Sequence, residues 1–274
     1  MARVPSEDGI ALHAEAAGEG LAVVFSCALN TTHENWRRQS DTLAARGYRA
    51  VLWDYRGHGL SDAPEDPEAY TMDRVVADLG AVLDWAAPGE RVVLAGLSFG
   101  GLASLHYVLG YPDRVRALVL AGTGPGFKNP KAQARWAESV GHTARFIERK
   151  GTAVFAERAT EMTVGRDLEL PEAQRAQAAI AKQVPHGLAH FGRQIAGLAP
   201  PVIDRLGEIG LPALVLRGEE DAAYERAAEV MASRMPRAET LAISGAGHIV
   251  NIEAADAFDA ALLAFLEQLR SEEA

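Results

Sequence analysis

The chain has 274 residues, 48% of them hydrophobic and 23% charged, which is typical of ordinary globular proteins and too rich in core-forming side chains for a disordered one. Its formal net charge of -10 gives no overall positive field for a phosphate backbone or an anionic membrane surface, which argues against both kinds of partner. The single cysteine, Cys27, excludes an intramolecular disulfide and a thiolate metal cluster.

The N-terminus carries Glu7 and Asp8 instead of the basic segment and apolar run of a secretory signal. No stretch approaches the ~20 apolar residues that cross a bilayer, and one of the longest, residues 260–266, has the spacing of an ordinary helix. We therefore expect a cytoplasmic protein with no nucleic-acid or membrane partner.

Short apolar runs bounded by turn residues alternate with segments of helical period along most of the chain. The runs expected to be strands are residues 10–16, 21–26, 50–53, 91–95, 117–121, 213–216 and 239–243. The segments expected to be helices include residues 36–43, 75–82, 99–109 and 258–269. Because most of the runs are nearly continuous in apolar residues, as strands covered on both faces are, we predict an α/β fold with a mostly parallel sheet.

Residues 124–205 interrupt this alternation, since they show helical patterns without convincing strands. We expect them to form an inserted helical subdomain, with residues 1–123 and 206–274 as the core. The insertion holds 12 Lys or Arg and 8 Asp or Glu, so it is locally basic. This excess is either arbitrary surface charge or a means of steering an anionic substrate. Its aromatic side chains, which could line a pocket or form a core of their own, are Phe127, Trp136, Phe146, Phe155 and Phe191.

A serine lies in a glycine-rich turn between a predicted strand and a predicted helix. Residues 96–101 read Gly-Leu-Ser-Phe-Gly-Gly, with Ser98 as the serine. A turn of this kind holds the serine in a strained conformation and pushes its hydroxyl out from the sheet edge, while Gly96 and Gly100 allow close backbone approach. The N-terminal amides of the following helix favour an anion at the same place. The pattern indicates a nucleophile more than an incidental serine in a turn.

A serine hydroxyl needs a base held by an acid before it becomes a good nucleophile. Among eight histidines, His248 follows the last predicted strand in the loop Gly-Ala-Gly-His, which would place it near the glycine-rich turn. His58 follows an earlier strand and is the rival, although its polar neighbours suit a structural loop. His186 and His190 could share a helix face as metal ligands, but no third ligand is evident and a surface pair is the simpler interpretation.

The acid is expected where the predicted strand 213–216 runs into Arg-Gly-Glu-Glu-Asp. Three carboxylates compete in this turn. Asp221 lies farthest along the loop and has the shortest side chain, which suits the orientation of an imidazole, whereas Glu219 and Glu220 could be solvated turn residues. Spacing alone leaves the choice open.

The chain order Ser98, Asp221, His248, together with the alternating strands and helices, resembles the α/β-hydrolase superfamily over nearly the whole chain. The segments that carry the resemblance are residues 96–101, residues 54–61 with the pattern D-x-R-G-H-G-x-S, residues 218–221 and residues 245–248. The resemblance implies an eight-stranded, mostly parallel sheet with a helical cap between the sixth and seventh strands. It also implies that Asp221 holds His248 and that Arg56 and His58 are structural.

Residues 25–30, Phe-Ser-Cys-Ala-Leu-Asn, lack the His-Gly pair common in this superfamily. They are instead similar to the S-N-S-L-G form of 3-oxoadipate enol-lactonases, and residues 31–36 continue the likeness. On this resemblance the backbone amides of Leu29 and Phe99 form the oxyanion hole, because backbone donors survive changes of side chain. Cys27 is then either a buried side chain with no role, or a thiol close enough to the pocket for a bulky reagent to displace the Leu29 amide.

These residues favour a serine hydrolase of a small carboxylic ester or lactone, with an anionic substrate as one option. Ser98 would attack the carbonyl, His248 would move the proton and Asp221 would orient His248, with no metal or cofactor required. The same triad in this superfamily also cleaves carbon–carbon bonds of β-diketones and ring-fission products or performs perhydrolysis. Epoxide hydrolases and dehalogenases would normally carry an aspartate in place of Ser98. A ligand receptor on a hydrolase scaffold is the alternative without an activity.

Overall fold

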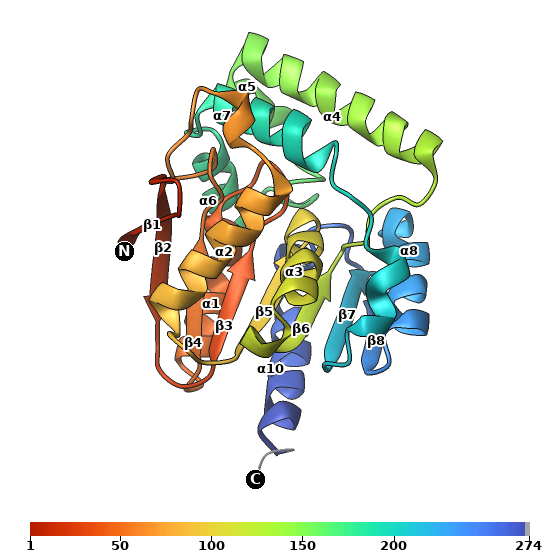
Figure 1. Ribbon diagram of the computed structural model, residues 1–274. Coiled ribbons are helices and arrows are strands. Elements are labelled where there is room, and N and C mark those ends of the chain that lie inside the picture. Colours follow the sequence, from red (N-terminus) through yellow and green to blue (C-terminus); the bar gives the residue numbers. More distant parts are fainter. Residues whose placement is uncertain (272–274) are drawn as a thin grey trace.

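One sheet of eight strands forms the centre of the computed structural model, which describes residues 1–271 (Figure 1). The strand order is β1-β2-β4-β3-β5-β6-β7-β8. β2 pairs antiparallel with both β1 and β4, and all the later neighbours are parallel. The strands are β1 (Ala2–Pro5), β2 (Ala11–Ala17), β3 (Ala22–Ser26), β4 (Arg49–Trp53), β5 (Val92–Leu97), β6 (Val115–Ala121), β7 (Ala213–Gly218) and β8 (Ala238–Ile243). The end of the expected core segment, residues 272–274, lies outside the described residues.

The apolar runs of the sequence become the buried strands of this sheet. Every residue of β3 and β5 is buried, because helices cover both faces of the sheet there. The prediction of an α/β fold with a mostly parallel sheet is thereby confirmed. β1 was not predicted, since its sequence Ala-Arg-Val-Pro buries only Val4. It lies at the edge of the sheet, where a proline is tolerated because it needs no ladder partner on its free side.

Helices pack on both faces of the sheet. α2 and α3 contact each other on one face, in front of the sheet in Figure 1, while α1 contacts α10 and α8 packs on β7 and β8. The helices of the core are α1 (Arg37–Ala44), α2 (Met72–Ala86), α3 (Phe99–Gly110), α8 (Ala222–Arg234), α9 (Val250–Glu253) and α10 (Ala255–Ser271). Short 3-10 helices are η1 (His33–Trp36), η2 (Pro67–Ala69), η3 (Pro112–Arg114) and η5 (Ile203–Glu208). No helix within residues 1–271 is both long and apolar enough to span a membrane.

A helical segment connects β6 to β7. It contains α4 (Pro130–Lys150), α5 (Thr152–Arg158), α6 (Pro171–Ile180), α7 (Pro185–His190) and the π-helix η4 (Phe191–Ala196). α4 and α7 pack against each other and lie across the top of the sheet in Figure 1. The segment therefore lies where a helical cap was expected, and we propose residues 124–205 as its limits.

Candidate active site

Ser98 lies at a sharp turn between β5 and α3. Its backbone has φ 55° and ψ -116°, a strained conformation for a residue with a side chain. The glycines beside it are required by close approach, because a Cβ on Gly96 would lie 2.3 Å from the carbonyl carbon of Gly100, and one on Gly100 would lie 2.2 Å from the carbonyl oxygen of Ser26. The Ser98 amide donates to the carbonyl of Ala121 at 2.8 Å, which ties the turn to β6. These contacts explain why the turn needs the pattern G-x-S-x-G.

Asp221 and His248 meet beyond the carboxyl ends of β7 and β8. His248 Nδ1 lies 2.8 Å from Asp221 Oδ2, and both side chains are buried. The other two carboxylates of the turn do not reach the imidazole, since Glu219 is exposed and Glu220 forms an ion pair with Arg166. Of the three carboxylates left open by the sequence, Asp221 is therefore the one in contact with His248.

The loops that carry Asp221 and His248 are packed directly on each other. A Cβ on Gly218, at the end of β7, would lie 2.2 Å from the carbonyl oxygen of Ala246. On the other side, a Cβ on Gly122, at the end of β6, would lie 3.3 Å from His248 Nδ1. The glycines at two strand ends thus allow the histidine loop to lie close to the sheet. The backbone of this loop then fixes the position of the imidazole.

Glu253 and Arg166 brace the histidine loop, and the sequence motifs predicted neither. The carboxylate of Glu253 accepts hydrogen bonds from the amides of Gly247 and Ile249, each at 3.1 Å, one on either side of His248. Arg166, from the helical segment, donates to Glu253 at 2.6 Å and to the carbonyl of Gly245 at 3.0 Å. The helical segment therefore supports the same loop that carries the histidine.

Tyr224 is a further residue of the site that the motifs did not predict. Its ring stacks on the His248 imidazole with centroids 4.9 Å apart and an angle of 21° between the planes. Its hydroxyl interacts with Ser98, and burial raises the pKa of the phenol despite this interaction. The only sequence signal is its position in the first turn of α8, three residues after Asp221. Tyr224 thus contacts both the serine and the histidine.

The predicted oxyanion donors, the amides of Leu29 and Phe99, belong to the loop after β3 and to the first residue of α3. Within residues 1–271 neither amide has a protein acceptor. Leu29 lines the cavity that contains Ser98, whereas Phe99 is not among its lining residues. The loop after β3 is held by Asn30, which adopts φ 65°. Its amide donates to Nε2 of His58 at 3.2 Å, and its carbonyl accepts from the Gln183 side chain at 2.8 Å.

His58 is a buried neutral imidazole in a supporting position. Burial lowers its pKa to about 4, and its Nε2 accepts the hydrogen bond from Asn30. The ring packs edge-on against Phe191 with centroids 4.5 Å apart. Nearby, the buried guanidinium of Arg56 forms a 2.7 Å ion pair with Asp78. His58 and Arg56 therefore hold the loops in place, and His58 does not line the cavity that contains Ser98.

His186 and His190 do not form a metal site within the described residues. Nε2 of His186 lies 3.0 Å from the carbonyl oxygen of Ala63, and the two rings stand 6.0 Å apart. No third His, Cys, Asp or Glu among residues 1–271 completes a cluster with them.

Ser98 and His248 line one cavity of about 300 Å³ under the helical segment. Its lining is Ala28, Leu29, Asn30, Ser98, Trp136, Ser139, Val140, Thr143, Phe155, Ala159, Met162, Thr163, Tyr224 and His248. None of these residues is Lys, Arg, Asp or Glu. Of the aromatic side chains in the insertion, Trp136 and Phe155 line the cavity, whereas Phe191 is fully buried and packs against Phe99 and Tyr55.

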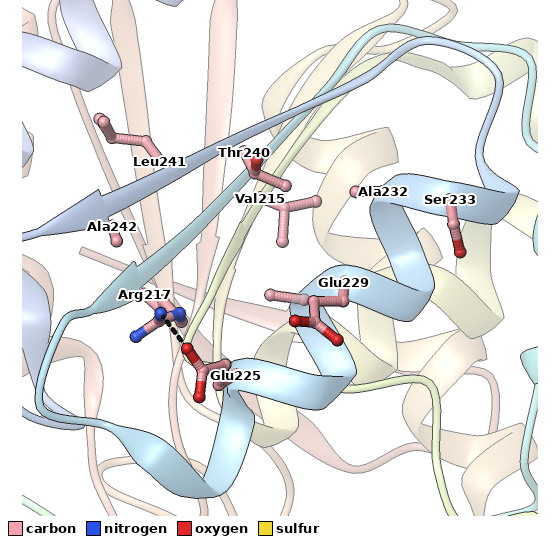
Figure 2. A pocket seen from close by; sticks show the side chains of 10 residues that line it. Val215, Arg217, Glu225, Glu229, Ala232, Ser233, Thr240, Leu241 and Ala242 are labelled. Carbon is pink, nitrogen blue, oxygen red and sulfur yellow. Dashed lines mark hydrogen bonds and ion pairs between the residues drawn. The ribbon is translucent and has the colours of Figure 1, made fainter.

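A larger cavity, of about 490 Å³, lies between β7, β8 and α8 (Figure 2). Figure 2 shows the guanidinium of Arg217 facing the carboxylate of Glu225, with which it forms a 2.8 Å ion pair. Its lining contains none of the predicted site residues. Of these, Leu29, Ser98 and His248 line the smaller cavity.

Cys27 is buried behind the oxyanion loop. Its sulfur faces the carbonyl oxygen of Trp53 at 3.8 Å, and burial raises the pKa of its thiol well above the usual value. It does not line the cavity that contains Ser98. The simpler of the two interpretations, a buried cysteine without a role in the pocket, agrees with this position.

The family is settled by comparison with known proteins. The model of a family described as alpha/beta hydrolase fold matches residues 22–255, most of the chain. The chain belongs to this family. The predicted resemblance to the α/β-hydrolase superfamily is confirmed.

Individual relatives differ in the reaction named for them. An epoxide hydrolase 2 from Siraitia grosvenorii is 39% identical over 114 residues, which cover 42% of this chain and 36% of that protein. A 3-oxoadipate enol-lactonase 2 from Acinetobacter baylyi is 28% identical, with 90% of this chain and 89% of that protein covered. The structure of a thermophilic esterase from Thermogutta terrifontis is similar with a TM-score of 0.85 at 25% identity, covering 98% of this chain and 97% of that one. The match to the epoxide hydrolase spans only about a third of that relative.

Proposed function

We propose that this protein is a serine hydrolase that cleaves a small, uncharged carboxylic ester or lactone through an acyl-enzyme. The observation that carries the proposal is the 2.8 Å contact between His248 and Asp221 beside a cavity that also exposes Ser98 on its strained turn. A serine at this position favours acyl transfer over the opening of an epoxide, because an acyl-enzyme needs a hydroxyl nucleophile with a general base beside it.

In the proposed reaction the hydroxyl of Ser98 attacks the substrate carbonyl and gives its proton to Nε2 of His248. Asp221 accepts the hydrogen bond from Nδ1, which fixes the tautomer and stabilises the imidazolium. The amides of Leu29 and Phe99 donate to the oxyanion, and they are available because neither has an acceptor within residues 1–271. The imidazolium then protonates the leaving oxygen, and a water activated by His248 hydrolyses the acyl-enzyme.

The lining of the cavity favours an uncharged substrate. A carboxylate buried there would lose its hydration without meeting a Lys or Arg side chain, which is costly. Several cations of the basic insertion are instead held in ion pairs outside the cavity, namely Lys128 with Asp204, Arg193 with Glu148, and Arg205 with Glu208. The cavity thus gives no support to the expected option of an anionic substrate, and the charge excess of the insertion is better explained as surface charge.

The test compares p-nitrophenyl butyrate with the p-nitrophenyl monoester of succinic acid, which has a similar length and a free carboxylate. We expect kcat/KM to be higher for the butyrate at both low and high salt, and the Ser98→Ala variant to be inactive on both. A preference for the succinate ester that weakens as salt is added would overturn the uncharged-substrate proposal and leave the hydrolase proposal intact.

The alternative reactions have separate readouts. Hydrolysis of a β-diketone in preference to esters and lactones would replace ester cleavage by carbon–carbon cleavage on the same residues. Enzyme-dependent halide oxidation in the presence of hydrogen peroxide and a carboxylic acid, which together form the oxidising peroxyacid, would indicate perhydrolysis. Tight binding of an ester without turnover, unchanged in Ser98→Ala, would indicate a receptor and would refute the enzymatic mechanism.

A further inference from the structure

Two histidines and a glutamate converge away from the candidate active site, between β2 and η1. His13 and Glu15 are two residues apart on β2 and share one face of the strand, and His33 is the first residue of η1. The Oε1 atom of Glu15 lies 3.1 Å from His13 Nε2 and 3.8 Å from His33 Nε2. The three atoms all lie within 4.8 Å of one another, and both imidazoles are buried.

We propose that His13, Glu15 and His33 bind one divalent transition-metal ion, for which zinc is the best match. Two imidazole nitrogens and one carboxylate oxygen are a donor set that zinc prefers. Ligands at ~2.0–2.2 Å in a tetrahedral site stand roughly 3.3 Å apart, which is close to the two separations measured from Glu15. An ion can therefore enter between these atoms with small side-chain adjustments.

The residues around the cluster orient its donor atoms toward a common point. Asp54, which is buried, accepts a hydrogen bond from His33 Nδ1 at 2.7 Å and so leaves Nε2 of His33 to face the carboxylates of Glu34 and Glu15. Arg37 donates to the Oε2 atom of Glu15 at 2.6 Å and leaves Oε1 to face the two imidazoles. Carboxylate partners on the far nitrogen of a ligating histidine are the usual support of zinc sites, because they fix the ring and raise its basicity.

The local charge balance also favours a cation. Three carboxylates, those of Glu15, Glu34 and Asp54, stand against the single guanidinium of Arg37 in this cluster. A divalent ion would add positive charge directly beside these carboxylates.

A third cavity, beside this cluster, provides access and room for a fourth ligand. It has a volume of about 330 Å³ and is lined by Glu15, His33 and Glu34. The carboxylate of Glu34 lies 3.3 Å from His33 Nε2, so it or a water could complete the coordination. Arg175 and Lys182 line the same cavity and would favour an anionic fourth ligand.

The position of the site predicts a structural role. A metal ion there would connect β2 to η1, which directly follows the loop containing Leu29 and Asn30. Ser98 and His248 line the separate cavity of about 300 Å³, so the ion would stabilise the fold without entering the proposed reaction. The inference is therefore independent of the proposed hydrolase activity.

The experiment uses the full chain without a histidine tag, freed of metal by a chelator and titrated at pH 8 with Zn²⁺ by calorimetry and with Co²⁺ by visible absorption. We expect one ion per chain, absorption bands typical of tetrahedral Co²⁺, and a higher Tm with Zn²⁺. His13→Gln and Glu15→Gln should each weaken Zn²⁺ binding by ~10-fold or more. His142→Gln, at an exposed histidine of α4, is the matched control and should bind as the wild type does.

His13→Gln is preferred to a change at His33, because the only side-chain hydrogen bond of His13 among the described residues is with Glu15, whereas loss of His33 would strand the buried Asp54. Circular dichroism of each metal-free variant checks that it folds. Failure of the folded wild type to bind one Zn²⁺ would overturn the proposal. So would equal affinity in His13→Gln and Glu15→Gln, or loss of binding in the His142→Gln control.

Discussion

The proposed reaction cavity has two walls that differ in origin. The strand-end wall consists of residues that follow the carboxyl ends of β3, β5, β7 and β8, namely Ala28, Leu29, Asn30, Ser98, Tyr224 and His248. The helical wall comes from the segment between β6 and β7 and consists of Trp136, Ser139, Val140, Thr143, Phe155, Ala159, Met162 and Thr163. The first wall carries the proposed reacting groups, while the second carries only apolar and neutral polar side chains.

The two walls are also constrained differently. Positions in the strand-end wall are fixed by the backbone, as in the strained turn at Ser98 and the αL conformation of Asn30. Positions in the helical wall are fixed by side-chain packing, as where the Trp136 indole donates to the carbonyl of Ala196 at 2.8 Å. We therefore expect changes in the strand-end wall to alter the rate of the reaction and changes in the helical wall to alter the choice of substrate.

The largest effect is expected for Ser98→Ala. Without the hydroxyl there is no nucleophile, so kcat should fall by roughly 10⁴-fold or more. The matched control is Ser139→Ala in the helical wall, which should leave kcat within ~3-fold because its hydroxyl has no role in the proposed chemistry. Ester turnover and circular dichroism are measured on both variants. Comparable losses of kcat in Ser98→Ala and Ser139→Ala would contradict the distinction between the two walls.

The next effect is expected for Asp221→Asn, which should lower kcat by about 10³–10⁴-fold because the amide favours the wrong tautomer of His248. Glu219→Gln and Glu220→Gln are controls at neighbouring positions of the same turn. Neither side chain contacts the imidazole, so each should retain most of the activity. Equal losses in all three variants would refute the assignment of Asp221.

The motifs of the strand-end wall could be predicted from the sequence because each has a local backbone cause. Gly96 and Gly100 are needed for close approach, and the loop with His248 follows a run of strand residues. The fold could also be predicted, because its buried strands are local features of the sequence, namely continuous apolar runs. Spacing alone did not decide which carboxylate meets His248, since Glu219, Glu220 and Asp221 share one turn, and Asp221 was predicted from its short side chain and the family resemblance.

The remaining parts of the site depend on contacts between distant segments. Tyr224 and Arg166 reach the histidine loop from segments far away in the sequence, and no spacing connects them with it. Glu253 lies only five residues after His248, but it belongs to none of the sequence motifs. The helical period of the insertion could not show that Phe155 lines the cavity while Phe191 is core. The excess of basic residues in the insertion also does not reveal that several of these residues form ion pairs away from the cavity.

The pH dependence of the free energy of unfolding tests the role of His58, which holds the loop of Asn30 in the strand-end wall. Its folded pKa of about 4 lies below the reference value of ~6.5, so the unfolded chain binds more protons between these values. The free energy of unfolding should therefore fall as the pH drops from about 6.5 toward 4, by up to about 3 kcal/mol from this group.

The matched variant for this test is His58→Gln, whose side chain can still accept from the Asn30 amide but does not titrate. Denaturant unfolding at pH 7 and pH 4.5 should show a smaller acid loss in the variant than in the wild type. An identical loss in both proteins would show that the imidazole is not held neutral.

A smaller effect on rate is expected for Tyr224→Phe. The ring can still stack on His248, but the interaction with Ser98 is lost, which is worth about 1 kcal/mol or roughly a 5-fold change in kcat/KM. Tyr224→Leu also removes the aromatic stacking and should shift the pH dependence of kcat/KM as well. A Tyr224→Phe variant with wild-type kinetics would limit the role of this residue to packing.

The smallest effect on rate, and the clearest effect on substrate choice, is expected for Trp136→Ala in the helical wall. Removing the indole enlarges the cavity beside the proposed nucleophile without touching the strand-end wall, so kcat for p-nitrophenyl acetate should stay within ~3-fold of the wild type. Longer acyl chains should gain, because an added methylene in an apolar pocket changes discrimination by about 10-fold or more. Trp85→Ala, at a partly exposed tryptophan of α2 outside the cavity, is the matched control and should leave the acyl-length profile unchanged. If Trp136→Ala instead lowers kcat equally for every acyl length, the helical wall takes part in the chemistry and the division between the two walls is wrong.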